Sequence, residues 1–267
     1  MFAILVMTWA AWGQVNAEKQ RPSDLDGLGG ALESELAGGF GNVDAFLFEG
    51  EGRVYWTRNP HHVLVFGNAA FASERAVLDG PAPARPLLAK VFQWENASQV
   101  YLGYGIDISR LWRIEGHGQL QHDRFLLLLH RRTLGLGARL ALWDGDRGGG
   151  HLGGGWMSEV EVSSRRLITG EAPRRHRHRA STYVSTHAAF GSATELLATV
   201  YAQPALVQPS DVRVLAEVDL NVALGANLQA GLELELRYDS QPPQTRRGIP
   251  SLAHWNGSID QTLAWEF

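Results

Sequence analysis

Histidine and arginine dominate residues 174–179, whose side chains could bind a metal ion or an anion. Neutral imidazole is a common metal ligand, and His176 and His178 lie two residues apart, so the pair could contribute to a metal site. Four arginines crowd the same six residues, however, and like charges at short range would repel a cation. We therefore interpret this stretch as a solvated loop.

Two other patterns only partly resemble catalytic or cofactor motifs. Gly135, Gly137 and Ala141 nearly satisfy a dinucleotide-binding fingerprint, but that motif needs a helix after its glycines, and this pattern continues as a strand. His122 and Asp123 could belong to a Ser-His-Asp triad, yet adjacent strand residues point to opposite faces. We expect no enzyme activity, no cofactor and no metal.

The elements that would position these residues are β-strands, because apolar and polar residues alternate with a period of two. In residues 228–238 the apolar positions run from Leu228 to Tyr238, and Glu233, Glu235 and Arg237 occupy the other face. Turn signals divide the chain into about twelve strands. These are expected to begin roughly at residues 30, 43, 61, 88, 110, 131, 151, 180, 194, 211, 227 and 253.

Connections between the expected strands alternate in length. Short ones are expected at residues 59–62, 104–109, 191–193 and 225–227, and long ones at 76–86, 165–179 and 240–251. An even number of strands places all three long loops at the end opposite the termini. This is typical of outer-membrane barrels, which have short periplasmic turns and longer extracellular loops. The glycine-rich residues 144–151 are expected to form the longest of the short turns.

Alternation alone fits a soluble sandwich as well as a membrane barrel, but the size of the sheet favours the barrel. A closed sheet of about twelve strands is too wide to be filled by an apolar core, so its polar face must line a wet interior. Its apolar face must then meet lipid, where an open sheet edge is too costly. The sequence therefore predicts an all-β fold, a closed antiparallel transmembrane β-barrel of about twelve strands.

Charged residues on the polar face are predicted to line the lumen. They are Glu33, Glu35, Glu49, Glu51, Arg53, Arg113, Glu115, Arg131, Arg139, Glu159, Glu161, Glu217, Asp219, Glu233, Glu235 and Arg237. Acids outnumber bases in this set, so an open lumen should favour small solutes that are cations. A lumen blocked by ion pairs would pass nothing large.

Composition limits the function classes and the domain organisation. The net charge of -4 argues against nucleic acid as a partner, and the absence of cysteine excludes disulfides and thiolate metal sites. Residues 1–17 resemble a signal peptide, although no Lys or Arg precedes their apolar run, and a buried N-terminal strand or helix is the alternative. We expect an N-terminal periplasmic segment over residues 18–29 and one barrel domain over residues 30–267.

Several stretches resemble the YdiY-like family of bacterial outer-membrane proteins, domain-of-unknown-function family 481. They are "LQHDRFLLLLHRRTLGLGARLAL" (120–142), "RASTYVSTHAAF" (179–190), "VYAQPALVQPSDVRVLAEVDL" (200–220), and "LRYDSQPP" (236–243) followed by a last strand ending in Phe267. "GFGNVD" (39–44) departs from the family, which usually reads closer to "SGNTD". The resemblance implies a barrel but no catalytic residues. The terminal aromatic resembles the signal read by the barrel insertion machinery, a further expected partner.

Arginines in the predicted long loops point to a lipid partner. Arg174, Arg175, Arg177 and Arg179 should lie beside the outer leaflet, where guanidinium groups bind phosphate. We therefore expect contact with lipopolysaccharide as well as outer-membrane lipid; simple loop solubility is the alternative. The sequence predicts a narrow pore or a structural protein of the bacterial outer membrane. The alternatives are an outer-membrane lipid hydrolase or acyltransferase, and a secreted β-barrel that binds a ligand.

Overall fold

The structure is a computed structural model of the 267-residue chain. It describes residues 17, 26–39, 43–76, 92–123, 128–145, 147–163, 174–225, 228–242 and 254–265. Most of the expected signal peptide and periplasmic segment, three long connections and Phe267 lie outside these residues. The side chains of Leu263 and Trp265, near the end of the last strand, also lie outside the description.

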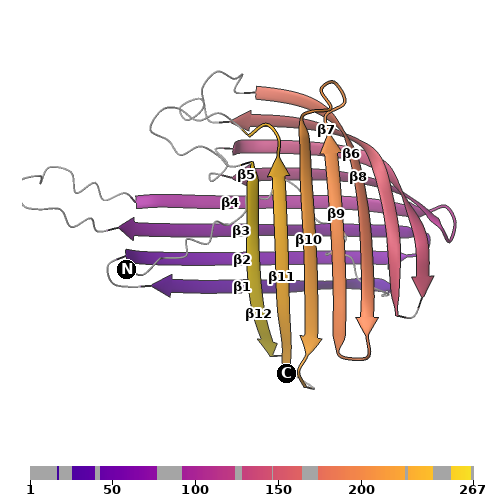
Figure 1. The fold of residues 1–267 in the computed structure, drawn as a ribbon, viewed down its shortest axis with the longest axis horizontal. Coiled ribbons are helices and arrows are strands. Elements are labelled where there is room, and N and C mark those ends of the chain that lie inside the picture. The colour runs from indigo at the N-terminus through magenta and orange to yellow at the C-terminus, as the bar shows by residue number, and fades with distance from the viewer. Residues whose placement is uncertain are drawn as a thin grey trace, which may run out of the picture.

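Twelve antiparallel strands form a single sheet in which the spatial order follows the chain (Figure 1). The strands are β1 (Gly27–Gly39), β2 (Val43–Arg58), β3 (His61–Ala76), β4 (Phe92–Asp107), β5 (Trp112–Asp123), β6 (Leu128–Gly145), β7 (Gly148–Ser163), β8 (Arg174–Phe190), β9 (Thr194–Pro204), β10 (Val212–Ala223), β11 (Leu228–Asp239) and β12 (Trp255–Trp265). The predicted all-β class and number of strands are confirmed. The largest error concerns β8, which was expected to begin at residue 180 and begins at Arg174.

The strands connect by short turns at one end of the sheet, which we call the turn end. These turns follow β2, β4, β6, β8 and β10, and the opposite end, the long-loop end, carries the long connections. Gly191 follows β8 with a φ of 74°, a left-handed conformation that glycine adopts at little cost. Residues 144–151 do not form the expected longer turn, since β6 extends to Gly145 and β7 begins at Gly148.

The sheet is strongly curved. Figure 1 shows β1–β4 lying across the page, while β9–β12 run up and down in front of them. Tyr183 of β8 donates a hydrogen bond to Glu115 of β5 over 3.3 Å. Those strands are three steps apart in the sheet, about 14 Å if it were flat, so the contact requires curvature with both side chains on the concave face. Register shifts in β5–β6 and β6–β7 contribute, because β-bulges bend a sheet.

The two edge strands each have one partner among the described residues. β1 pairs with β2, and β12 pairs with β11. The described pairings therefore form an open series, and the predicted closure between the first and last strands is absent from them. Among the described residues there is no helical segment that could span a membrane.

Candidate functional site

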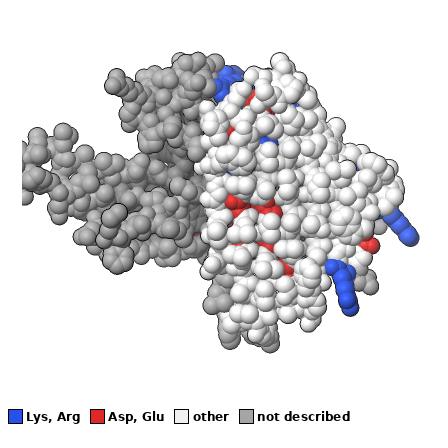
Figure 2. Space-filling model, in the orientation of Figure 1, with Lys and Arg blue, Asp and Glu red and all other residues white. Residues whose placement is uncertain are grey.

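The convex and concave faces of the sheet differ sharply in chemistry. On the convex face Leu134 is 63% exposed and Ile259 is 66% exposed, whereas Glu159 on the concave face is 1% exposed. Figure 2 shows the described surface in this view as mostly white, with Lys and Arg mainly at its margins and a group of Asp and Glu near the middle. Strand alternation produces this separation, since successive side chains point to opposite faces. The concave face, which gathers the charges, is the candidate functional site.

The residues predicted to line a lumen occupy this concave face wherever their side chains are described. They are Glu49, Glu51, Arg53, Arg113, Glu115, Arg131, Arg139, Glu159, Glu161, Glu217, Asp219, Glu233, Glu235 and Arg237. The side chains of Glu33 and Glu35 lie outside the description. That these residues line a water-filled lumen stays a prediction.

A set of mostly buried ion pairs, the charge network, lies towards the long-loop end. Its members are Arg131, Glu159, Glu161, Arg177, Arg179, Asp211, Arg213 and Asp239. At its centre Arg213 donates to Glu159 over 2.6 Å and to Glu161 over 3.0 Å. Arg131 donates to the same Glu161 oxygen over 3.0 Å. One carboxylate is thus shared by arginines from β6 and β10.

The second half of the charge network centres on Asp211, just before β10. Arg179 and Arg177 each approach a different oxygen of this carboxylate, both at 2.9 Å. Arg179 also donates to the backbone carbonyls of Gln203 and Asp211, and its side chain is 0% exposed. Arg213 extends the network to Asp239 at 3.1 Å. Four positive and four negative groups therefore compensate one another within a packed region.

Sequence reasoning missed five members of this network as lumen residues: Arg177, Arg179, Asp211, Arg213 and Asp239. The alternation of β10 already places Arg213 on the same face as Glu217, so this residue could have been found. Asp211 could not, because it lies outside a strand and its partner Arg179 comes from a distant segment. The network therefore depends on tertiary contacts that no local pattern reveals.

The predicted loop at residues 174–179 is wrong. These residues belong to β8 and pair with residues 157–162 of β7. Alternation sends Arg175, Arg177 and Arg179 to the concave face and leaves Arg174 exposed on the other. Lipopolysaccharide contact stays a prediction, but only Arg174 of the four has the exposure it needs. The long connections contain five further arginines, at 85, 165, 166, 246 and 247, which lie outside the described residues.

His176 and His178, which were expected in a solvated loop, lie instead on the convex face of β8. Their rings lie edge to face with centroids 4.7 Å apart, and His178 stacks on Trp156 of β7 at 5.5 Å. Ser158 and His176 form a hydrogen bond of 2.9 Å. The two histidines thus belong to a surface of β7 and β8 rather than to a connection.

An aromatic pocket lies on the concave face beside the charge network. Tyr101 stacks on His117 at 5.7 Å, and Tyr183 lies 5.1 Å from Tyr201. Amides and hydroxyls complete the lining together with Glu115, and it includes Gln119, Thr133, Ser181 and Gln203. Ala17, the last residue of the expected signal peptide, is buried in the same region with Phe66 and Tyr101. The pocket could hold a small molecule with both apolar and hydroxyl surfaces.

Glycines let the aromatic rings lie flat against the wall. A Cβ atom on Gly153 would lie 1.9 Å from the Tyr183 ring, and one on Gly135 would lie 2.2 Å from the His117 ring. Gly137 faces Gly155 across β6 and β7, where a Cβ would meet the Gly154 carbonyl at 2.7 Å. The glycines of the incomplete dinucleotide motif therefore lie within β6, where they allow close packing.

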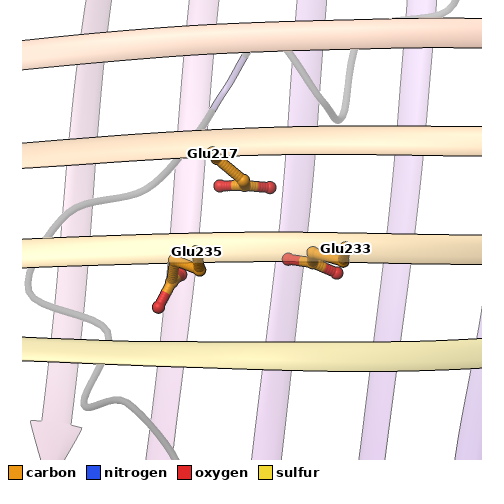
Figure 3. Close-up of side chains that lie close together, drawn as sticks. All are labelled: Glu217, Glu233 and Glu235. Atoms are coloured by element: carbon orange, nitrogen blue, oxygen red, sulfur yellow. The ribbon is translucent and has the colours of Figure 1, made fainter.

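Three carboxylates on β10 and β11 form an acidic group. Carboxylate oxygens of Glu217, Glu233 and Glu235 all lie within 4.8 Å of one another (Figure 3). Oxygen ligands of this type suit hard cations such as Ca²⁺. Arg237 donates a hydrogen bond to Glu235, so part of this negative charge is already compensated. Of the described residues, these carboxylates have the geometry closest to a metal-binding set.

A smaller ion cluster lies at the turn end. Asp107 of β4 accepts hydrogen bonds from Arg113 of β5 at 2.6 Å and pairs with His62 of β3 at 2.7 Å. These contacts tie three neighbouring strands together. Elsewhere on β5, Asp123 is fully buried, while His122 bonds the Leu129 carbonyl at 2.6 Å. The two residues of the incomplete triad therefore lie in different surroundings.

Comparison with known proteins finds a matching family model and several solved structures that resemble the chain distantly. The model, described as a protein of unknown function, DUF481, matches residues 93–247, more than half of the chain. The crystal structure of the siderophore receptor PirA from Acinetobacter baumannii is similar with a TM-score of 0.40 and 10% identity. The match covers 75% of this chain but only 34% of that one, too low a similarity to identify a function. No curated protein matches the chain.

Proposed function

The chain belongs to the DUF481 family of proteins of unknown function, and we propose that it is a closed outer-membrane β-barrel that acts as a narrow pore with an acidic interior. The family resemblance read from the sequence is confirmed at this level, while the narrower YdiY-like name stays a prediction. A catalytic role forms no part of the proposal.

The observation that carries this proposal is the inverted distribution of side chains. Large apolar residues are exposed across the convex face, including Leu136 at 61%, Val184 at 50% and Val200 at 50%, while arginines and carboxylates are buried. In water so extensive an apolar surface would drive aggregation, because exposed patches on soluble monomers are normally small. Against hydrocarbon the same surface is favourable, and the charges need the polar interior that a barrel supplies.

Closure of the sheet follows from the same environment. An unpaired strand edge in hydrocarbon costs several kcal/mol for each unsatisfied backbone group. The outer edges of β1 and β12 are the two edges of this sheet, so we propose that they pair with each other in the membrane. The curvature seen over β5–β10 supports closure, since side chains three strands apart already meet.

The proposed orientation places the turn end in the periplasm. Exposed aromatic residues gather near this end on the convex face, among them Tyr104, Trp112, Trp143 and Phe190. Such residues are favoured at membrane interfaces, where an apolar ring meets a polar layer. The long-loop end then faces outward, as in outer-membrane barrels with long extracellular loops.

A narrow pore is the function that this interior supports best. The charge network packs the long-loop end so closely that Arg179 and Glu159 are almost without exposure. Beside it, the acidic group of Glu217, Glu233 and Glu235 would attract cations. We therefore expect small cations to pass and large solutes to be excluded. The burial of the network also favours a second candidate, a closed structural envelope protein without conductance.

Purified protein in planar bilayers tests the proposal. A small cation-selective conductance is the expected result, and clear anion selectivity would contradict the acidic interior. Absence of conductance in a protein that fractionates with outer membranes and migrates differently after heating in detergent would favour the structural role. Recovery as a water-soluble protein would instead point to a secreted ligand-binding barrel, and lipid hydrolysis by pure protein to an enzyme.

A further inference from the structure

Basic side chains gather on the convex face of β5–β8 near the long-loop end. We call this set the basic patch; it comprises His122, His130, Arg132, Arg174, His176 and His178. Arg132, Arg174, His176 and His178 are exposed, and His122 and His130 are half-buried. The patch consists of two arginines and four histidines that three strands bring to one surface.

Strand register aligns these residues in rows. Val160 of β7 pairs with Arg132 on one side and with His176 on the other. In the next row, Val162 pairs with His130 and with Arg174. Each row thus presents one arginine and one histidine on either side of a valine. Because facing residues in neighbouring strands are about 5 Å apart, the two basic side chains of a row are about 10 Å apart.

The carboxylates of this region point the other way. Among the described residues of β5–β8 at the level of the patch, the carboxylates are Asp123, Glu159 and Glu161. All three lie on the concave face and are buried. The sheet itself separates them from the basic patch. The exposed charges of the patch are therefore all of one sign, which favours an anionic partner.

The apolar band below the patch fixes its height in a membrane. Phe190 lies near the turn end of β8, and Ala180 of the same strand pairs with Trp156 of β7. The ten residues between these levels span about 25 Å at a rise of about 3.3 Å per residue and a tilt of about 40°. That equals the apolar band of an outer-membrane barrel. Trp156, stacked on His178, then marks the outer interface.

We propose that the basic patch binds the phosphate groups of lipopolysaccharide in the outer leaflet, an inference that rests on the proposed outer-membrane location. Headgroup phosphates lie directly above the apolar band, at the height of Arg132, Arg174 and His176. Guanidinium groups bind phosphate through two parallel hydrogen bonds, and imidazole N–H groups add further donors. The site differs from the one expected from the sequence, since Arg175, Arg177 and Arg179 face the interior.

A matched pair of double variants tests this site with purified lipopolysaccharide as the probe. The patch variant carries Arg132→Ser and Arg174→Ser, and the control carries Arg110→Ser and Arg147→Ser in exposed turns at the turn end. Both lose the same charge. We expect the patch variant to bind lipopolysaccharide about tenfold more weakly or worse, and the control to bind like the original protein.

Dephosphorylated lipopolysaccharide and free inorganic phosphate separate the possible sources of binding. The original protein should lose affinity for the dephosphorylated lipid, and inorganic phosphate at modest concentration should not compete. The proposed site would be wrong if the patch variant bound lipopolysaccharide as tightly as the original protein does. It would also be wrong if the control variant lost as much affinity as the patch variant. Gel migration before and after heating in detergent tests whether each of the three proteins forms a barrel. If the original protein shows no such shift, the proposed barrel fails; if it shows the shift but the patch variant binds normally, only the site fails.

Discussion

Arg213 shows how single residues hold the interior together. Its guanidinium contacts Glu159 and Glu161 of β7 and Asp239 of β11, although β8 and β9 separate β7 from β10 in the sheet. Buried ion pairs of this kind contribute little net stability when complete, but removing one partner is costly. The charge network therefore fixes the relative positions of strands, such as β7 and β10, that do not pair with each other in the sheet.

Gly153 offers a direct test of how the aromatic pocket is built. Gly153→Ala should lower the free energy of unfolding by about 1–3 kcal/mol, because the added methyl group collides with the Tyr183 ring. Denaturant unfolding in detergent micelles, followed by tryptophan fluorescence, measures the change.

Gly154→Ala is the matched control for that substitution. A Cβ at Gly154 meets only the Thr182 methyl group at 4.0 Å, so stability should change by less than about 0.5 kcal/mol. In a protein that already carries Tyr183→Ala, Gly153→Ala should lower the free energy of unfolding much less, because the ring that it collides with is gone. Equal effects of the two glycine substitutions would show that the ring does not lie on Gly153.

Strand β8 shows which parts of the site the sequence reveals. Residues 175–179 already alternate arginine with histidine, in phase with the rest of the strand to Phe190. Their density of charge nevertheless favoured a loop, because a charged run is usually solvated. The carboxylates that compensate it come from β7 and from Asp211, far away in the sequence.

The faces of the strands were more predictable than the contacts between them. Alternation correctly placed Leu234 on an exposed face and Glu235 on a buried one. It could not show that Tyr183 reaches Glu115 or that Arg213 reaches Glu159, since both contacts depend on the curvature of the sheet. The face on which each side chain lies could therefore be predicted from neighbouring residues in the sequence, whereas the contacts of the charge network could not.

A charge placed at the middle of β8 distinguishes lipid from water outside the sheet. Val184 is 50% exposed, and Val184→Arg should cost about 2–4 kcal/mol in a bilayer, because the residue lies near the centre of the apolar band. Urea unfolding in lipid vesicles measures this cost. On a water-exposed surface the same substitution would change stability by only about 0.5 kcal/mol.

Val207→Arg provides the reference for that measurement. Val207 is 92% exposed in the connection between β9 and β10, beyond the band, so an arginine there should be neutral in either solvent. If Val184→Arg were as harmless as Val207→Arg, the convex face would not contact hydrocarbon.

Closure of the whole sheet can be tested with cysteines, because the chain has none of its own. Leu32→Cys on β1, combined in turn with Gly257→Cys, Ile259→Cys or Gln261→Cys on β12, should form a disulfide in at least one pairing if the barrel closes. Leu32→Cys with Gly52→Cys is the positive control, since these positions face each other in the β1–β2 ladder. Crosslinking in the control alone, with the protein in membranes, would indicate an open sheet.

The meander order also bears on how such a protein can change its size during evolution. Within the described residues, each strand pairs in the sheet only with its neighbours in the chain, so the fold is a series of hairpins. Duplication or loss of one hairpin would change the number of strands by two and leave the order of the remaining strands unchanged. Loss of β8 and β9, however, would remove Arg177 and Arg179 and leave Asp211 without these partners.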